Sequence, residues 1–163
     1  MTAWIFGILF ICFLTLLDQG TKLLAIFYLK GQSDYVLIPG ILKLKYLENR
    51  GMAFGMFEGK IPVFIILCII FFIIFFYVYA RIPKTAYYFP MAFVCLIMVS
   101  GALGNFIDRI MRGYVVDFIY FSLIDFPVFN MADIYVVCSG ISLILLVCLK
   151  YRDDNDYAFL KLR

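Results

Sequence analysis

The sequence predicts an all-α membrane protein with four transmembrane helices, a small β-hairpin and a short polar loop segment. Hydrophobic residues make up 66% of its 163 residues and charged residues 15%, whereas soluble domains are about 45–50% apolar and about 25% charged. The apolar residues gather into runs long enough to cross a hydrocarbon core of about 30 Å. Four such runs occur, at about residues 4–28, 61–80, 86–107 and 131–149. We expect one polytopic membrane domain, residues 1–163, without a separate soluble module.

The bulk composition also excludes several kinds of partner and site. The net charge of +3 is small and the basic residues form no continuous run, so nucleic acid is not an expected partner. All five cysteines lie inside apolar runs, where a thiol packs as a small hydrophobic group, and no CxxC motif occurs. The chain has no histidine, which excludes histidine-dependent triads and histidine metal sites. We therefore expect neither a metal nor a cofactor.

The first apolar run is predicted to be a spanning helix that continues to about Tyr28. A secretory leader is less consistent, because no Lys or Arg precedes the run and no small-x-small cleavage site follows it. Asp18 and Lys22 are four residues apart near one end of this helix, with the acid first, so they share a face. Two interpretations stay open for them, a neutralising pair that anchors the helix end and a part of a functional site.

Residues 31–60 differ in character from the apolar runs on either side. A Pro39-Gly40 turn separates YVLI from ILKLKYLE, and apolar residues alternate with lysines from Leu42 to Tyr46. This alternation and the turn predict a β-hairpin at the membrane surface. Asn49 and a stretch rich in glycine and phenylalanine follow. That stretch is either a plain surface loop or a loop that holds a substrate.

The second and third spanning helices are predicted to be antiparallel neighbours joined by a tight connection. Residues 61–80 contain no charge, and a short connection at residues 81–84 leads to the next apolar run. That third run ends in small residues, which let helices approach closely. If this helix continues past them, one polar stripe forms from Asn105, Asp108, Arg109 and Arg112.

The stretch from Asn105 to Asp133 concentrates the polar chemistry of the chain between two spanning runs. Its four carboxylates belong to Asp108, Asp117, Asp125 and Asp133. Ionisable groups at the edge of a membrane are costly, so a cluster of them indicates a functional site. Asp117 falls in YVVDFIYF, a β-branched and aromatic segment that predicts extended backbone. Asp133 follows Asn130 by three residues, which fits either a capped helix start or a site residue.

Paired carboxylates are the chemistry that remains in this stretch. Two aspartates that share a proton hydrolyse peptides when the ionised one takes a proton from water and the protonated one polarises the scissile carbonyl. Asp117 and Asp133 are the best pair, because they lie on different elements that can converge. Asp108 lies beside Arg109 and four residues before Arg112, which suits a structural ion pair.

These residues alone leave an aspartic protease and a proton-coupled transporter or channel as equal alternatives, with an assembly subunit as a third. A transporter needs a polar path across the bilayer. The charged groups inside the apolar runs, and those of the stretch from Asn105 to Asp133, gather instead at one end. This one-sided arrangement favours hydrolysis over transport.

Four crossings place both termini on one side of the membrane. That side carries six Lys or Arg residues and the other side eight, counting Lys22, so the positive-inside rule does not favour termini in the cytoplasm. The last segment, residues 150–163, is polar and mixed in sign. We expect it to be loosely ordered.

Five motifs, in order along the chain, resemble those of the lipoprotein signal peptidase (signal peptidase II) family. They are DQGTK at 18–22, NRGMAF at 49–54, GNFIDR at 104–109, VVDF at 115–118 and FNMAD at 129–133. The resemblance implies an intramembrane aspartic endopeptidase of bacteria. Such an enzyme cleaves diacylglyceryl-modified prolipoproteins just before the lipid-modified cysteine.

The resemblance also implies roles for individual residues. By match to the motifs, Asp117 and Asp133 form the catalytic dyad. The residues expected to line or brace the site are Asn49, Asn105, Arg109 and Asn130, and Asp18 and Lys22 match the polar end of the first helix. Two positions depart from the family pattern, Met52 in place of alanine and Gly20 in place of a larger apolar residue. They leave open the shape of the substrate loop and the packing of the helices.

The resemblance further implies a place in the cell and a set of partners. The family lies in the bacterial cell membrane, with both termini in the cytoplasm and the site near the outer leaflet. The hairpin would then form an extracytoplasmic cradle beside an extracytoplasmic loop segment. Expected partners are prolipoprotein substrates, membrane lipids and inhibitors of the globomycin type, and we expect a monomer.

Overall fold

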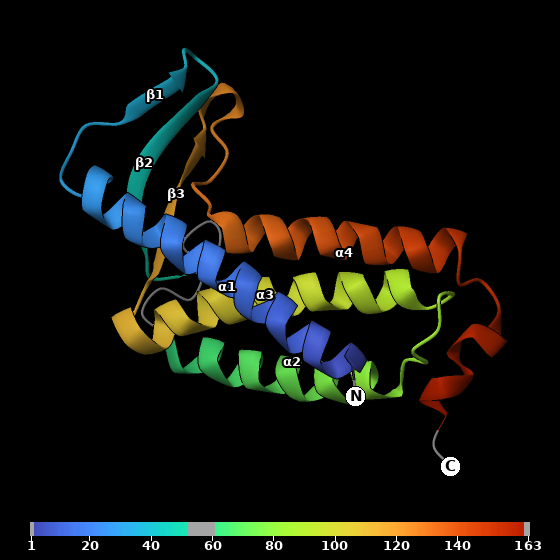
Figure 1. Ribbon diagram of the computed structural model, residues 1–163. Coiled ribbons are helices and arrows are strands. Elements are labelled where there is room, and N and C mark those ends of the chain that lie inside the picture. Colours follow the sequence, from blue (N-terminus) through green and yellow to red (C-terminus); the bar gives the residue numbers. More distant parts are fainter. Residues whose placement is uncertain (1, 52–60, 162–163) are drawn as a thin grey trace.

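The computed structural model describes residues 2–51 and 61–161. Within these residues, four long helices form the body of the molecule and a three-stranded sheet stands at one end (Figure 1). The helices are α1 (Thr2–Leu29), α2 (Ile61–Arg81), α3 (Phe89–Arg112) and α4 (Met131–Leu149). Each is long and apolar enough to cross a membrane, as predicted. The N- and C-terminal ends lie together at the end of the bundle away from the sheet.

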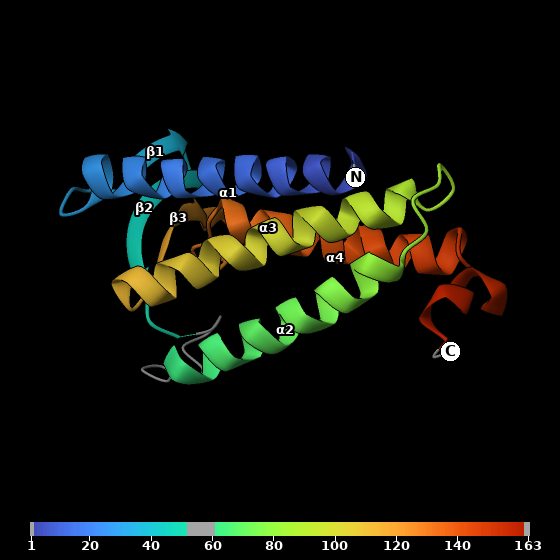
Figure 2. The same ribbon diagram turned by 60° about the horizontal axis from the view of Figure 1, so that its bottom comes forward.

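The helices expose apolar side chains where lipid would surround them. Phe27 on α1, Ile73 on α2 and Ile144 on α4 are each more than 60% exposed, which is costly in water but favourable in hydrocarbon. Helix α3 is the central element and packs against the other three. Figure 2 shows α1 and α2 on opposite sides of it. The bundle is therefore organised around α3, the helix that carries the polar stripe.

Small residues on α3 permit the close helix contacts that the sequence predicts. A Cβ added at Gly101 would overlap the backbone carbonyl of Ala132 on α4, and one added at Gly104 would overlap the carboxylate of Asp18 on α1. The helix begins at Phe89 rather than near residue 86, with proline in its first turn. It continues through Arg112 and ends at Gly113, whose φ of 75° is the left-handed conformation that glycine adopts easily. The polar stripe is therefore helical along its full length.

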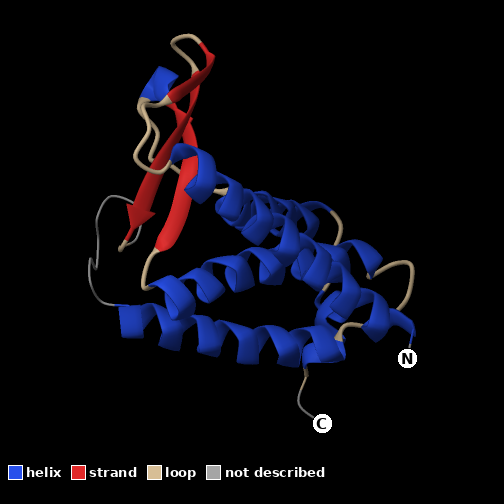
Figure 3. Ribbon diagram, turned by 60° about the vertical axis from the view of Figure 1, so that its left-hand side comes forward, coloured by secondary structure: helices blue, strands red, loops and turns tan. Residues whose placement is uncertain are grey.

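The sheet joins the predicted hairpin to a third strand from later in the chain. Strands β1 (Tyr35–Ile38), β2 (Leu42–Asn49) and β3 (Val115–Phe121) form an antiparallel sheet in the order β1-β2-β3 (Figure 3). The register places Leu47 opposite Asp117 and Asn49 opposite Val115. An apolar cluster of Ala25, Val116 and Phe118 fixes the sheet against the end of α1. The predicted extended segment around Asp117 is thus the strand that anchors the hairpin to the bundle.

The C-terminal segment differs from the expectation of a loosely ordered tail. Residues Asp154–Leu160 form a short 3-10 helix, η3, that returns to the helix ends. Tyr151 is 1% exposed and its hydroxyl donates to the carbonyl of Tyr87 at 2.7 Å. The hydroxyl of Tyr88 donates to the carbonyl of Asp156 at 3.0 Å. The prediction was wrong because tyrosines that bury their rings and satisfy their hydroxyl groups outweigh the polar composition of the segment.

Candidate active site

The two aspartates at the bundle end near the sheet belong to one hydrogen-bonded network. Asp117 lies on β3 and Asp133 in the first turn of α4. Asn130 links them: its Nδ2 donates to Asp117 Oδ1 at 2.6 Å, and its Oδ1 accepts the backbone N–H of Asp133 at 3.0 Å. Asn105 on α3 donates through Nδ2 to Asp133 Oδ1 at 2.8 Å. Segments far apart in the sequence therefore bring these carboxylates to one place.

Asn130 and Asp133 also form the helix cap that the sequence predicts. Asn130 has extended backbone, with φ −133° and ψ −177°, and its side chain receives the Asp133 N–H. Asp133 Oδ2 in turn accepts the backbone N–H of Asn130 at 3.1 Å, which completes a capping box. The other oxygen of Asp133 is the one that meets Asn105. Capping and a role in the site are therefore compatible, and the positive end of α4 stabilises negative charge on Asp133.

Asp117 has the surroundings of a carboxyl group that holds its proton. Its residue is 1% exposed, and it accepts hydrogen bonds from the amide groups of Asn49 at 2.8 Å and Asn130 at 2.6 Å. Burial, and then the nearby charge of Asp133, raise the pKa of Asp117 to about 7, although the two asparagine hydrogen bonds act to lower it. At neutral pH, Asp117 is thus poised between its neutral and ionised forms. This is the condition in which one carboxyl acts as acid beside an ionised neighbour.

A cluster of buried charged side chains lies next to the site. Lys22 on α1 lies 2.9 Å from Asp18 Oδ2 and 3.1 Å from Asp108 Oδ2, and all three side chains are 0% exposed. Arg112 forms a second ion pair with Asp108. The ion pairs predicted for Asp18 with Lys22 and for Asp108 with Arg112 are therefore both present. They join in one cluster, which satisfies charges that would be costly to bury alone.

The ion cluster is connected to the segments of Asp117 and Asp133 by three further hydrogen bonds. Lys22 Nζ donates to Asn105 Oδ1 at 2.9 Å, which leaves the amide nitrogen of Asn105 facing Asp133. Asp18 Oδ1 accepts the backbone N–H of Ala132 at 2.9 Å, next to Asp133. Asp108 Oδ2 accepts the backbone N–H of Val116 at 3.1 Å, next to Asp117. The cluster therefore fixes the backbone beside each aspartate.

The other sequence-predicted residues lie around this network. Arg109 donates to the carbonyl of Asn105 at 3.2 Å, and its guanidinium lies over the ring of Phe64 on α2, 4.6 Å from the centroid. Asn49 is oriented by the backbone N–H of Gly51, which donates to its Oδ1 at 3.0 Å. Asp125 lies outside the network and accepts from the hydroxyl of Tyr120 at 2.5 Å. The residues predicted to line or brace the site are thus all joined to the network, Arg109 through a backbone carbonyl alone.

One member of the network was not singled out from the sequence. Gln19 donates through Nε2 to the carbonyl of Gly104 at 3.1 Å and to Asp108 Oδ1 at 3.2 Å. Its Oε1 accepts from Arg112 at 3.2 Å. Its position beside Asp18, inside the first motif, is the signal that could have indicated this role.

The two departures from the family pattern have different outcomes. A Cβ added at Gly20 would meet no other atom within 4 Å, so glycine at this position is not a packing requirement. Met52 lies outside the described residues, as does most of the stretch in which a substrate loop was considered.

Comparison with known proteins gives consistent matches over most of the chain. A family model described as signal peptidase (SPase) II matches residues 10–149. The lipoprotein signal peptidase of Caldanaerobacter subterraneus subsp. tengcongensis is 40% identical over 145 residues, which cover 88% of this chain and 97% of the relative. That of Streptococcus pyogenes serotype M1 is 33% identical over 147 residues, 90% of this chain and 94% of the relative. A solved structure of a bacterial membrane enzyme superimposes with a TM-score of 0.78 at 35% identity, covering 91% of this chain and 92% of that one.

Proposed function

This chain belongs to the signal peptidase II family of multi-pass membrane proteases, which remove signal peptides from lipoproteins, and we propose that it acts as an intramembrane aspartic endopeptidase. Its substrates are diacylglyceryl-modified prolipoproteins, cut just before the lipid-modified cysteine. Asp117 and Asp133 are the catalytic dyad. The observation that carries this assignment is their shared partner Asn130, together with the pKa of Asp117 raised to about 7 by burial and by the charge of Asp133.

The proposed reaction gives the two carboxyl groups different tasks. Ionised Asp133, favoured by the helix start and by the Asn105 amide, takes a proton from the attacking water. Protonated Asp117 gives its proton to the scissile carbonyl oxygen as the water oxygen bonds to the carbonyl carbon. Collapse of the resulting diol returns a hydroxyl proton to Asp117. Asp133 passes its proton to the departing amide nitrogen, so the C–N bond breaks and both groups regain their starting states.

The remaining site residues are proposed to position the dyad. Asn105 and Asn130 hold the two carboxyl groups through direct hydrogen bonds, and Asn49 holds Asp117 from the hairpin side. Asp18 and Lys22 position the start of α4 and the amide of Asn105. Arg109 supplies a positive charge between α2 and the network, where a substrate carbonyl could meet it.

We also propose that the site faces the outer leaflet and that both termini lie in the cytoplasm. Both termini lie at the end of the bundle opposite the sheet (Figure 1). Asp117 lies on β3 of that sheet and Asp133 in the first turn of α4, so termini in the cytoplasm are consistent with a site at the outer leaflet. A lipid-modified substrate would then reach the dyad sideways through the bilayer. Inhibitors of the globomycin type would occupy the same place, and the enzyme would work as a monomer.

The transporter alternative receives less support from the arrangement of charges. Between Asp133 at its start and Lys150 at its end cap, α4 carries no charged side chain, and α2 carries none before Arg81. The buried cluster of charges lies at one end of the bundle, beside the sheet. A proton path across the membrane would need titratable groups along these helices.

The substrate class is tested by comparing one prolipoprotein with and without its diacylglyceryl group. Purified protein in detergent should cleave the modified form, and mass spectrometry should place the new N-terminus at the lipid-modified cysteine. Equal cleavage of both forms, or a cut at another bond, would overturn the proposed specificity. Proton uptake into vesicles without any cleavage would favour the transporter instead.

A further inference from the structure

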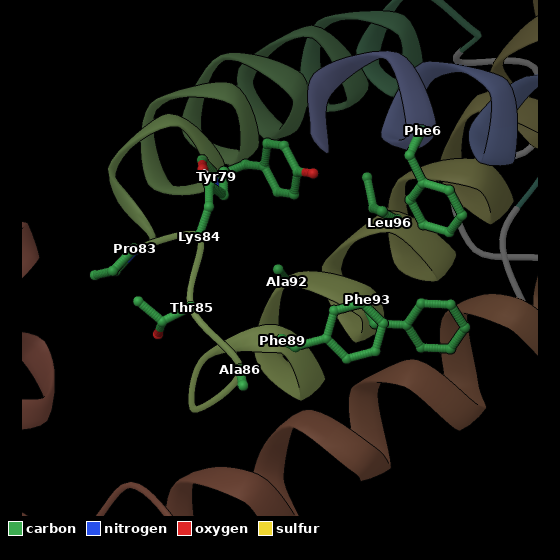
Figure 4. A pocket seen from close by; sticks show the side chains of 10 residues that line it. All are labelled: Phe6, Tyr79, Pro83, Lys84, Thr85, Ala86, Phe89, Ala92, Phe93 and Leu96. Atoms are coloured by element: carbon green, nitrogen blue, oxygen red, sulfur yellow. Dashed lines mark hydrogen bonds between the residues drawn. The ribbon is translucent and has the colours of Figure 1, made fainter. Parts of the chain in front are cut away.

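A large cavity lies at the opposite end of the bundle from the dyad. It has a volume of about 570 Å³, within the range of about 300–1,000 Å³ typical of ligand pockets. Its walls come from α1, from the end of α2, from the connection at residues 82–88 and from the first half of α3. Figure 4 shows Tyr79 and Lys84 on one side of it and the apolar side chains of Phe6 and Leu96 on the other. Nothing in the proposed proteolysis uses this cavity.

The lining of the cavity is charged near the membrane surface and apolar deeper in the membrane, which matches the charged headgroup and apolar acyl chains of a phospholipid. Lys84 lies in the connection between two spanning helices, and therefore at the membrane–water boundary. Phe89, Phe93 and Leu96 line the cavity along α3, over about 10 Å at 1.5 Å per residue. A charged group thus lies at the boundary, and an apolar wall extends from there toward the bilayer interior.

The ammonium group of Lys84 is available to a negatively charged ligand. It donates to the backbone carbonyl of Tyr79 at 2.5 Å and lies 3.8 Å from the centroid of the Tyr79 ring and 5.3 Å from that of Trp4. Within the described part of the chain, no carboxylate comes within 4 Å of it. Among residues 2–51 and 61–161 it makes no hydrogen bond besides the one to the Tyr79 carbonyl, so N–H donors remain for a ligand. A lysine at this depth attracts the phosphate of an anionic lipid.

Tyr79 adds a second polar group to the cavity wall. Its residue is 5% exposed, and its hydroxyl group has no hydrogen-bond partner among residues 2–51 and 61–161. The hydroxyl points toward α1, where a Cβ added at Gly7 would lie 3.0 Å from it. Among the described residues, the enclosed side-chain oxygens that lack a partner belong to Thr15 and Ser122, so the Tyr79 oxygen is accessible from the cavity and can donate to a ligand there. An ester carbonyl placed just below a phosphate would satisfy it.

The positive charge continues around the rim beyond the cavity. A smaller cavity of about 350 Å³ lies between α3 and α4, shares Phe93 with the first and has Lys150 in its lining. Lys150 lies over the rings of Tyr87 and Tyr151. The aspartates of η3 do not pair with Lys84, and Asp156 is bound by the hydroxyl of Tyr87 at 2.9 Å. A lysine therefore lines each of these two cavities.

We propose that the cavity between α1 and α3 binds an anionic phospholipid. Its phosphate lies at Lys84, its ester region at the hydroxyl of Tyr79, and one acyl chain along Phe93 and Leu96. This site is separate from the proteolytic one and does not depend on the identity of the catalytic residues.

The only tryptophan in the sequence, Trp4, is a built-in reporter for this cavity. Its ring lies 5.2 Å from that of Tyr79, so bromine atoms on a bound acyl chain should quench its fluorescence. The protein is placed in phosphatidylcholine vesicles containing small fractions of brominated phosphatidylglycerol or brominated phosphatidylcholine. We expect half-maximal quenching at about a fivefold lower fraction of the anionic lipid, the preference that one lysine gives at a charged membrane surface.

Two variants that each remove one positive charge distinguish binding in this cavity from a general attraction of basic residues to anionic lipids. Lys84→Gln should remove the preference for the anionic lipid. Lys161→Gln, which removes an exposed charge from the same end of the molecule, should keep it. Equal quenching by the two lipids in the wild type would overturn the proposal, as would a preference that survives in Lys84→Gln. Ala92→Leu, which adds atoms to the cavity wall, should weaken quenching by both lipids, and unchanged quenching would contradict occupancy of the cavity.

Discussion

Asn130 touches both aspartates of the proposed dyad. It donates to Asp117 Oδ1 at 2.6 Å and accepts the backbone N–H of Asp133 at 3.0 Å, and it is 0% exposed. The same side chain therefore starts helix α4 and orients the carboxyl group on β3. Because these two tasks use different atoms of the amide, substitutions can separate them.

Replacing Asn130 by serine or alanine should separate the cap from the dyad. Asn130→Ser keeps a good helix cap but lacks the donor that reaches Asp117, so stability should change by less than about 1 kcal/mol. Cleavage should fall at least about tenfold, because Asp117 loses one of the two groups that position it. Asn130→Ala should lose cleavage and also about 1 kcal/mol of stability. Thermal unfolding in detergent and initial cleavage rates measure the two effects, and full activity in Asn130→Ser would contradict the positioning role.

The raised pKa of Asp117 predicts that its charge destabilises the fold as pH rises. Its pKa is about 7 in the folded protein, against an ordinary value of 3.8 for aspartate. The favourable contribution of protonated Asp117 to the free energy of unfolding is therefore complete below about pH 4, and it is lost as the pH rises through 7. Asp117→Asn cannot ionise. The variant should therefore gain stability relative to the wild type between pH 5 and pH 8, on the order of 1–3 kcal/mol.

Unfolding temperatures of the wild type and Asp117→Asn at pH 5 and pH 8 check this prediction. The difference between the two proteins, rather than either value alone, is the quantity to follow, because asparagine also changes the local hydrogen bonds. Asp34→Asn is the matched control, since Asp34 is an exposed carboxylate at the hairpin. A difference that does not move with pH would show that burial does not hold a proton on Asp117.

The buried ion cluster predicts a large cost for removing its central cation. Lys22→Met leaves the carboxylates of Asp18 and Asp108 without their shared partner at 0% exposure, which should cost about 3–5 kcal/mol of unfolding free energy. Lys30→Met removes a lysine whose pair with Glu48 is exposed, so its cost should stay below about 1 kcal/mol. Denaturation in detergent compares the two. Similar costs would mean that the cluster is not a structural support.

The two glycines at positions 104 and 20 form another matched pair. Gly104→Ala places a methyl group against the carboxylate of Asp18 and should destabilise the protein by about 1–3 kcal/mol. Gly20→Ala meets open space inside a helix and should be neutral or stabilise by up to about 1 kcal/mol. Unfolding temperatures decide between these outcomes. A neutral Gly104→Ala would contradict a close contact between α1 and α3 at Asp18.

The sequence was sufficient for the helices and for much of the site, but not for the contacts between them. Apolar runs predict spanning helices because lipid cannot satisfy exposed backbone groups, and the spacing of Asn130 and Asp133 predicts their cap. The pairing of Leu47 with Asp117, across 70 residues, has no local signal. The same is true of the hydrogen bond from Ala132 to Asp18. Such contacts depend on how the helices pack, which their composition does not specify.

The most direct test of the proposed dyad is cleavage of a diacylglyceryl-modified prolipoprotein by Asp117→Asn and Asp133→Asn in detergent. Both variants should keep their helical content, as measured by circular dichroism, and lose cleavage by at least about a thousandfold. Asp125→Asn, which changes a carboxylate outside the network, should cleave at the wild-type rate. Cleavage near the wild-type rate by either folded dyad variant would contradict the aspartic mechanism.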